Sequence, residues 1–290
     1  MSLTCYKACA NLQVPLDYDD QLFGTTNIAF VKSDGDSPDA EDVLFNPGGP
    51  GVSGIDHLRQ GNKELRAGGI GSKYNLIGFD PRGVGYSGPN LNCFTDPAAS
   101  QYYDTLLDTK NVVANNKVVL TQQYAEADAF GKWCSAALIN STAGYAGTVA
   151  VAQDMLHFVK LRAGSRDQDT DNAKLNFYGA SYGTILGSTF ATMFPDRVGK
   201  FVLNGVADVE DWYKGDKITN LNQLDGAVEF FFSECYAEKE QCDFNKNATS
   251  VDQIKDRLYV TPGFNIHPSS FQDTLSLHYP IILCLLCITP

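Results

Sequence analysis

The sequence has no cluster of basic residues. Of its 290 residues, 22 are Lys or Arg and 34 are Asp or Glu, and the net charge is −12 with histidine neutral. A protein that binds nucleic acid or another polyanion needs positive charge gathered on one face. The composition therefore predicts no nucleic-acid partner.

A long apolar run and an N-terminal leader are also missing. The closing apolar stretch, Ile281 to Ile288, is far shorter than the about 20 residues that a transmembrane helix needs. Residues 1–5 lack the apolar centre of a signal peptide. We expect no membrane span, and a chain that is either intracellular or lacks its true start.

The sequence carries no recognisable cofactor motif. Its glycine-rich stretches lack the spacing of a dinucleotide-binding fold and the lysine of a P-loop. Cys284 and Cys287 have the spacing of a zinc-ligand pair, but they lie in an apolar run without a second pair. We expect no metal, nucleotide or flavin.

Cysteine, by contrast, is plentiful. Eight cysteines are many for a reducing compartment. We predict disulfides 93–134 and 235–242, although sequence alone does not determine the connectivity. The alternative is free, buried thiols in a cytosolic enzyme. Asn140 and Asn247 begin Asn-x-Thr sequons, which are glycosylation acceptors if the chain is secreted.

Short apolar runs alternate with helical patterns, which predicts a doubly wound, mainly parallel α/β sheet. Residues 27–31 are expected to form an early edge strand, because Pro15 precedes them. Further strands are predicted over residues 43–45, 74–79, 175–178 and 201–203, and helices over 122–138, 148–161 and 185–194. One face of the helix at 148–161 carries Val149, Ala152, Leu156 and Val159.

The chain is organised around Gly179-Ala-Ser181-Tyr-Gly183. An apolar run precedes this stretch and a helical pattern follows it, which is the layout of a nucleophile elbow. Such a serine is held at positive φ, and its glycine neighbours are required where strand and helix nearly touch. The alternative is a glycine-rich turn without chemistry.

Two other predicted strands also end in glycine-rich loops. One loop is Asn46 to Gly54 and the other is Asp80 to Gly88. A strand that ends in such a loop is where an open α/β sheet places a binding crevice. The alternative for each loop is a plain tight turn.

With these motifs the chain resembles the α/β-hydrolase superfamily, and within it the tripeptidyl/prolyl aminopeptidase branch of secreted serine peptidases. The resemblance covers about residues 9 to 215. It rests on residues 9–17, 46–54, 78–88, 179–198 and 203–208. One departure is Asn204, where the family more often has Asp. The resemblance implies an α/β-hydrolase fold with a cap domain, and an extracellular location.

It also implies a mechanism. Ser181 would attack a scissile carbonyl and form an acyl-enzyme. Backbone N–H groups of Tyr182 and of the turn at Gly49 would hold the oxyanion. Asp80 and Arg82 are expected to form an ion pair that braces their loop.

The rest of a triad is harder to place. In this fold the acid and the histidine follow the serine, and only His267 and His278 follow Ser181. Neither has a suitable strand before it, and His57 and His157 precede the expected position. Asp208 is the best candidate acid. The alternative is that it is an aspartate in the loop that leads into the cap and has no catalytic role.

We therefore expect a core at 1–208, a partial helical cap at 209–267 and an irregular tail at 268–290. Because the family pattern is lost after about residue 261, we expect a truncated chain that has lost its acid and histidine. The leading hypothesis is an aminopeptidase-type serine hydrolase that acts on short N-terminal peptides and is impaired by this loss. The alternatives are an esterase or lipase on the same fold, and an inactive fragment that binds without turnover. The oligomeric state is left open.

Overall fold

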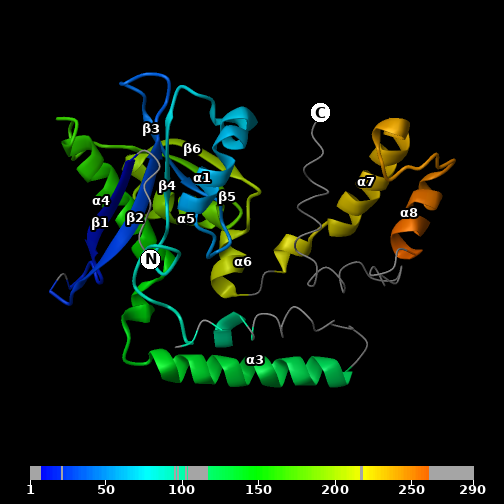
Figure 1. Cartoon of the computed structure of the whole chain (residues 1–290), viewed down its shortest axis with the longest axis horizontal. Helices are drawn as coiled ribbons and strands as arrows, with labels where there is room; N and C mark the ends of the chain where they lie inside the picture. The colour runs from blue at the N-terminus through cyan, green and yellow to red at the C-terminus, as the bar shows by residue number, and fades with distance from the viewer. Residues whose placement is uncertain are drawn as a thin grey trace. The chain divides into compact units, whose positions relative to one another are not determined.

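The first compact unit of the chain is built on a six-stranded β-sheet (Figure 1). The computed structural model describes residues 8–20, 22–94, 96, 98–101, 103, 117–215 and 218–260. The strands are β1 (Ala8–Pro15), β2 (Thr25–Ser33), β3 (Asp42–Asn46), β4 (Asn75–Phe79), β5 (Leu175–Ala180) and β6 (Val198–Asn204). Their order is β1-β2-β4-β3-β5-β6, with antiparallel pairing around β2 and parallel pairing from β4 to β6. The predicted mainly parallel α/β sheet is confirmed.

The edge position beside β2 belongs to β1. Residues 27–31, the predicted edge strand, lie in β2, which pairs with β1 on one side and with β4 on the other. Pro15 is the last residue of β1. A proline lacks the N–H that a central strand needs, so it limits the strand that it ends and not the next one. Residues 27–31 therefore form a strand as predicted, whereas the predicted edge position was wrong.

Helices cover both faces of the sheet. On one face, α1 (Gly54–Leu65) packs Ile55 and Leu58 against β2, β3 and β4. On the other face, α4 (Thr148–Gly164) and α5 (Tyr182–Met193) enclose the larger core. Its largest fully buried side chains include Phe79, Phe177 and Phe190. Each contributes roughly 1.5–3 kcal/mol through burial.

The buried face of α4 differs in part from the predicted one. Ala152 and Val159 are buried as expected, whereas Val149 is 48% exposed. The helix meets the core through a stripe of residues spaced four apart: Val151, Met155 and Val159. Residues at this spacing lie above one another on a helix. The predicted buried face of the helix was therefore correct at Ala152 and Val159 and wrong at Val149, in the first turn.

A second compact unit combines residues 94–134 with residues from 217 onward. Its helices are most of α3 (Lys117–Leu138), α7 (Leu224–Glu238) and α8 (Val251–Val260), whereas α6 (Val209–Lys214) belongs to the first unit. Short helical turns are η1 (Arg66–Ile70), η2 (Thr142–Tyr145), η3 (Pro195–Arg197), η4 (Thr219–Leu221) and η5 (Lys239–Gln241). Among the described helices, none combines the length and apolarity needed to cross a membrane. The predicted limits at 208 and 267 stay predictions, and the tail at 268–290 lies outside the described residues.

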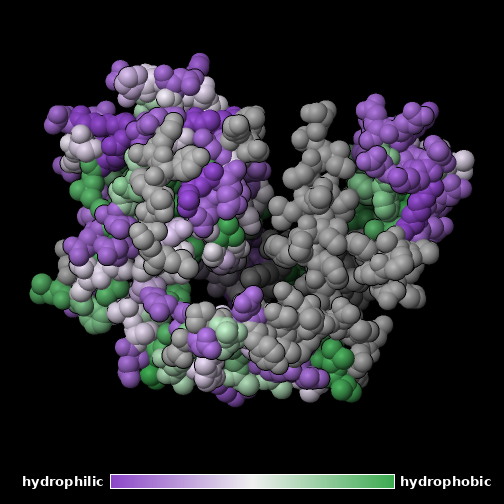
Figure 2. All heavy atoms as spheres, in the orientation of Figure 1, coloured by the Kyte–Doolittle hydropathy of each residue, from purple (hydrophilic) through white to green (hydrophobic). Residues whose placement is uncertain are grey.

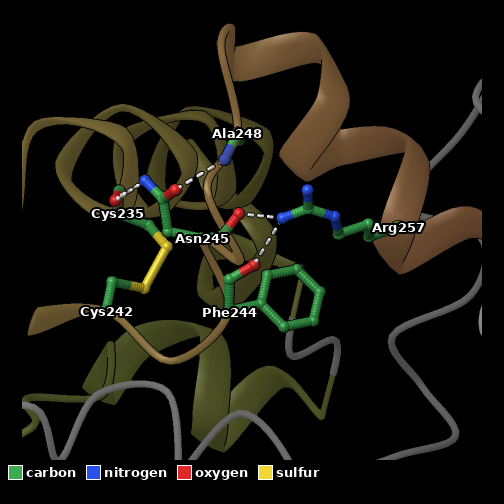
Figure 3. The surroundings of a disulfide bond; sticks show 6 residues. All are labelled: Cys235, Cys242, Phe244, Asn245, Ala248 and Arg257. Atoms are coloured by element: carbon green, nitrogen blue, oxygen red, sulfur yellow. Dashed lines mark hydrogen bonds between the residues drawn. A yellow bond between two sulfur atoms is a disulfide. The ribbon is translucent and has the colours of Figure 1, made fainter. Parts of the chain in front are cut away.

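A disulfide between Cys235 and Cys242 links the end of α7 to the loop before α8 (Figure 3). Beside it, the buried amide of Asn245 donates to the carbonyl oxygen of Cys235 at 2.9 Å and accepts the N–H of Ala248 at 2.8 Å. Arg257 of α8 donates to the carbonyl oxygens of the same loop. These contacts satisfy a buried polar side chain. The predicted 235–242 disulfide is confirmed.

One face of the pair formed by α7 and α8 is largely polar. Hydrophilic side chains cover much of the face of α7 and α8 that is visible in Figure 2, while Phe232 and Ile254 are fully buried between the helices. Cys93 and Cys134 are each disulfide-bonded as well, and their pairing with each other stays a prediction.

Candidate active site

The carboxyl ends of four parallel strands meet at one edge of the sheet. Strands β3, β4, β5 and β6 run in the same direction. The segments that follow them are the 46–54 loop, the 80–88 loop, Ser181, and residues 205–208. Ligand sites of open α/β sheets lie at this edge.

Ser181 occupies the turn between β5 and α5. Its backbone has φ 52° and ψ −121°, a conformation that costs about 1–3 kcal/mol for a residue with a side chain. Its N–H donates to the carbonyl oxygen of Asn204 at 3.0 Å, and its carbonyl oxygen accepts the N–H of Thr184 at 2.8 Å. The side chain is exposed. The fold therefore stabilises a strained turn in which the side chain of Ser181 is exposed to solvent.

The glycines beside Ser181 are required by close packing. A Cβ at Gly179 would lie 2.3 Å from the carbonyl oxygen of Gly183, and one at Gly183 would lie 2.7 Å from that of Asn46. Both distances are impossible for a real Cβ contact. The predicted close approach of strand and helix is confirmed.

The 46–54 loop lies directly against the elbow. A Cβ at Gly48 would be 2.8 Å from the Cβ of Ser181 and 3.1 Å from the nitrogen of Tyr182. The N–H of Gly48 is bound to Oδ1 of Asn46 at 3.0 Å, whereas the N–H of Gly49 has no acceptor within the described part of the chain. Of the two amides in the turn, the one at Gly49 is available to a ligand.

The side chain of Tyr182 is buried, and its contacts are with α4 and α6. Its hydroxyl shares a hydrogen bond of 2.9 Å with Thr148 on α4, and its ring lies 5.3 Å from that of Trp212 on α6. Burial raises the pKa of the phenol. Its N–H begins α5, where the first amides have no intrahelical acceptor. The group that Tyr182 can offer a ligand is therefore its backbone N–H.

Asp80 and Arg82 do not pair with each other, so that prediction was wrong. Arg82 binds Asp154 of α4 through two hydrogen bonds, Nε to Oδ2 at 2.7 Å and Nη2 to Oδ1 at 2.9 Å. Its remaining N–H groups donate to the carbonyl oxygens of Leu16, Pro15 and Tyr145. A planar guanidinium matches a carboxylate in this two-bond geometry. Asp80 instead binds neutral donors.

Asp154 also receives a neutral donor. The hydroxyl of Tyr18 donates to its Oδ1 at 2.9 Å. Burial raises the pKa of Asp154, and the bonds from Arg82 oppose this shift. Burial and the neighbouring Asp154 charge raise the pKa of Tyr18 strongly. These contacts join β1, the 80–88 loop and α4.

The candidate acid and bases are placed as follows. Asp208 caps α6, because its Oδ1 accepts the N–H of Asp211 at 3.0 Å; a catalytic role for it stays untested. His57 lies on α1 with its ring 5.3 Å from that of Phe45, and burial lowers its pKa. His157 lies half-buried on α4. His267 and His278 lie outside the described residues.

Two contributors to the site were missed by sequence reasoning. Thr184 is fully buried, and its hydroxyl donates to the Ser181 carbonyl oxygen at 2.7 Å while it accepts the N–H of Ala207 at 3.0 Å. Asn46 is fully buried too, and its Nδ2 has no partner within the described structure. A threonine three residues after an elbow serine is a signal that could have been used, because such a hydroxyl can reach back to the turn.

Residues 43–237 match the family described as alpha/beta hydrolase fold, and the chain belongs to this family. Serine protease Hip1 of Mycobacterium tuberculosis is 30% identical over 200 residues, which are 69% of this chain and 36% of that protein. Tripeptidyl aminopeptidase of Streptomyces lividans is 29% identical over 241 residues, and the match covers 77% of this chain and 38% of that protein. Carboxylesterase B of M. tuberculosis is 32% identical over 148 residues, and the match covers 51% of this chain and 27% of that protein. The chain thus spans little more than a third of the relatives that it matches over the greatest length.

Proposed function

We propose that this chain carries the nucleophile of an aminopeptidase-type serine hydrolase that removes short peptides from free N-termini. The observation that supports it best is the strained, exposed Ser181 with Gly48 of the 46–54 loop packed against it. Similarity to a serine protease and a tripeptidyl aminopeptidase favours a peptide substrate.

In this proposal Oγ of Ser181 attacks the scissile carbonyl carbon and forms a tetrahedral oxyanion. The N–H groups of Tyr182 and Gly49 receive the oxyanion, and each such donor contributes about 3–4 kcal/mol to the barrier reduction in related enzymes. Collapse releases the amine and leaves an acyl-enzyme, which water then hydrolyses.

A base must accept the hydroxyl proton of Ser181. This hydroxyl makes no hydrogen bond within the described residues, and the two histidines that follow Ser181, His267 and His278, lie outside them. A serine with its base missing retains only a small part of its reactivity. We therefore propose that the hydrolase activity of this chain is impaired.

A fluorophosphonate probe tests the nucleophile in the full chain, because labelling requires an activated serine hydroxyl. Wild type should be labelled on prolonged incubation, and slowly, because its activity is impaired. Ser181→Ala should not be labelled, and Ser188→Ala on the same helix should match wild type. If wild type is not labelled, or if Ser181→Ala is labelled equally, the hydrolase proposal fails. The alternative of a binding fragment without turnover would then be favoured.

An esterase is the second candidate, because carboxylesterase B is 32% identical to part of this chain. A tripeptidyl or aminoacyl anilide and a short-chain ester separate the two. Faster turnover of the anilide supports a peptidase, and faster turnover of the ester contradicts it.

An extracellular location is also part of the proposal. The Cys235–Cys242 disulfide and the disulfide-bonded Cys93 and Cys134 are typical of an oxidising compartment. Asn140 and Asn247 are both exposed, so the folded chain has room for a glycan at either sequon.

A further inference from the structure

Asp80 is a fully buried carboxylate between the two glycine-rich loops. It follows the last residue of β4. Its Oδ1 accepts the hydroxyl of Ser53 at 2.7 Å and the N–H of Ile55 at 3.2 Å, and its Oδ2 accepts the N–H of Tyr86 at 3.0 Å. One side chain therefore holds the end of the 46–54 loop and the middle of the 80–88 loop.

No cation balances this charge within the described ranges. Arg82, the basic residue two positions along, is bound to Asp154. Burial raises the pKa of Asp80 although three donors oppose the shift, and the nearby Asp56 raises it further. A buried carboxylate whose ionised form is disfavoured detracts from folding stability. Stability alone does not account for an aspartate at this position.

The contacts of Asp80 lead to the nucleophile in two steps. Ser53, which donates to Asp80, also accepts the N–H of Asp56 and so begins α1. The other end of the same loop is held where Asn46 accepts the N–H of Gly48. Between these two anchors lie Gly48, which packs against Ser181, and its neighbour Gly49.

The backbone packs closely around Asp80 and the end of β4. A Cβ at Gly85, where φ is +51°, would be 2.2 Å from Oδ2 of Asp80. A Cβ at Gly54 would be 2.3 Å from the carbonyl oxygen of Phe79. Glycine at both positions allows the two loops to close around the carboxylate.

We propose that Asp80 is a positioning residue for the oxyanion side of the site. Through Ser53 and the amide of Ile55, it holds the 46–54 loop in the conformation that packs Gly48 against Ser181 and leaves the Gly49 N–H without an acceptor among the described residues. This inference rests on the proposed roles of Ser181 and Gly49. Asp80 does not touch the substrate.

The test compares Asp80→Asn with wild type in the full chain. Asparagine keeps the shape, but its amide nitrogen would face an N–H or hydroxyl donor on one side. Asp39→Asn is the matched control, because Asp39 is an exposed aspartate that contacts neither Asp80 nor Ser53. Ser53→Ala removes one of the three donors and serves as a second variant if Asp80→Asn does not fold.

Three quantities are measured: amide deuterium exchange of peptides covering residues 46–54, the rate of fluorophosphonate labelling, and the thermal unfolding midpoint. In Asp80→Asn we expect exchange in the loop to rise roughly tenfold or more. Labelling should fall roughly 10- to 100-fold, since one oxyanion donor is displaced. The midpoint should change little, because removing the unfavourable buried charge offsets the lost hydrogen bond. Ser53→Ala should show smaller changes in the same direction, and Asp39→Asn should match wild type.

Two results would overturn the inference. In the first, loop exchange in Asp80→Asn and Ser53→Ala equals that of wild type. In the second, exchange rises throughout the protein as the midpoint falls, which indicates a merely structural role. If wild type is not labelled at all, the proposed function fails, and the exchange data still decide whether Asp80 holds the loop.

Discussion

The hydroxyl of Thr184 donates to the carbonyl oxygen of Ser181 at 2.7 Å and accepts the N–H of Ala207 at 3.0 Å. One buried side chain thus joins the elbow to the segment that follows β6. The Ser181 N–H forms a second link to this region through the carbonyl oxygen of Asn204. The strained turn is therefore held from the neighbouring strand as well as by its own helix.

We predict that Thr184→Val loses stability and reactivity together. Valine has the same shape but leaves the Ala207 N–H without its acceptor, which costs about 1–3 kcal/mol. Urea unfolding should show this loss, and labelling of Ser181 should slow. Thr192→Val on the same helix is the control, because Thr192 is exposed and bonds only to the carbonyl oxygen of Ser188. Equal unfolding curves for Thr184→Val and wild type would contradict the prediction.

Gly183→Ala should destabilise the fold, because the new Cβ would lie 2.7 Å from the Asn46 carbonyl oxygen. We expect a loss of roughly 1–3 kcal/mol or more, as for other overpacked sites. Gly226→Ala in α7 is the opposite case, since a Cβ there meets nothing within 4 Å. It should gain up to about 1 kcal/mol from helix propensity. Denaturant midpoints of the two variants that move in the same direction would rule out this steric account.

Asp154→Asn should lower stability by about 3–5 kcal/mol, because it leaves the guanidinium of Arg82 buried without its counterion. Asp128→Asn breaks an exposed pair with Lys132 on α3, where the expected change is below about 1 kcal/mol. Chemical denaturation of both variants provides the comparison. A small effect at Asp154 would mean that the carbonyl acceptors of Leu16, Pro15 and Tyr145 are sufficient for Arg82.

Expression in a eukaryotic secretory pathway should yield N-glycosylated chain, since Asn140 and Asn247 are exposed sequon asparagines. Enzymatic removal of N-glycans should then lower the mass, and the double Asn140→Gln/Asn247→Gln variant should show no such shift. A wild-type mass that enzymatic treatment leaves unchanged would count against the predicted modification. It would also weaken the case for an extracellular protein.

The elbow was predictable because its constraints are local. Gly179, Ser181 and Gly183 are two residues apart, and a strand before and a helix after them leave one type of turn. The same holds for the strands that end in glycine-rich loops. The Cys235–Cys242 disulfide closes a short segment, with a sequence separation of 7. In these cases the chain meets itself within a few residues, so spacing carries the information.

The sequence by itself thus determined the α/β class, the strained turn at Ser181 and the glycines around it. Only the tertiary structure decided which residues support them. Arg82 pairs with Asp154, 72 positions away, and not with Asp80; Thr184 reaches Ala207, and Asp80 joins two loops. A hydrogen bond depends on where strands and helices converge in space, and residues far apart in the chain carry no spacing signal for it. For the same reason, the sequence suggested that Arg82 pairs with Asp80, the nearest opposite charge along the chain. In the structure its partner is Asp154 on α4, whose carboxylate binds the guanidinium through two hydrogen bonds.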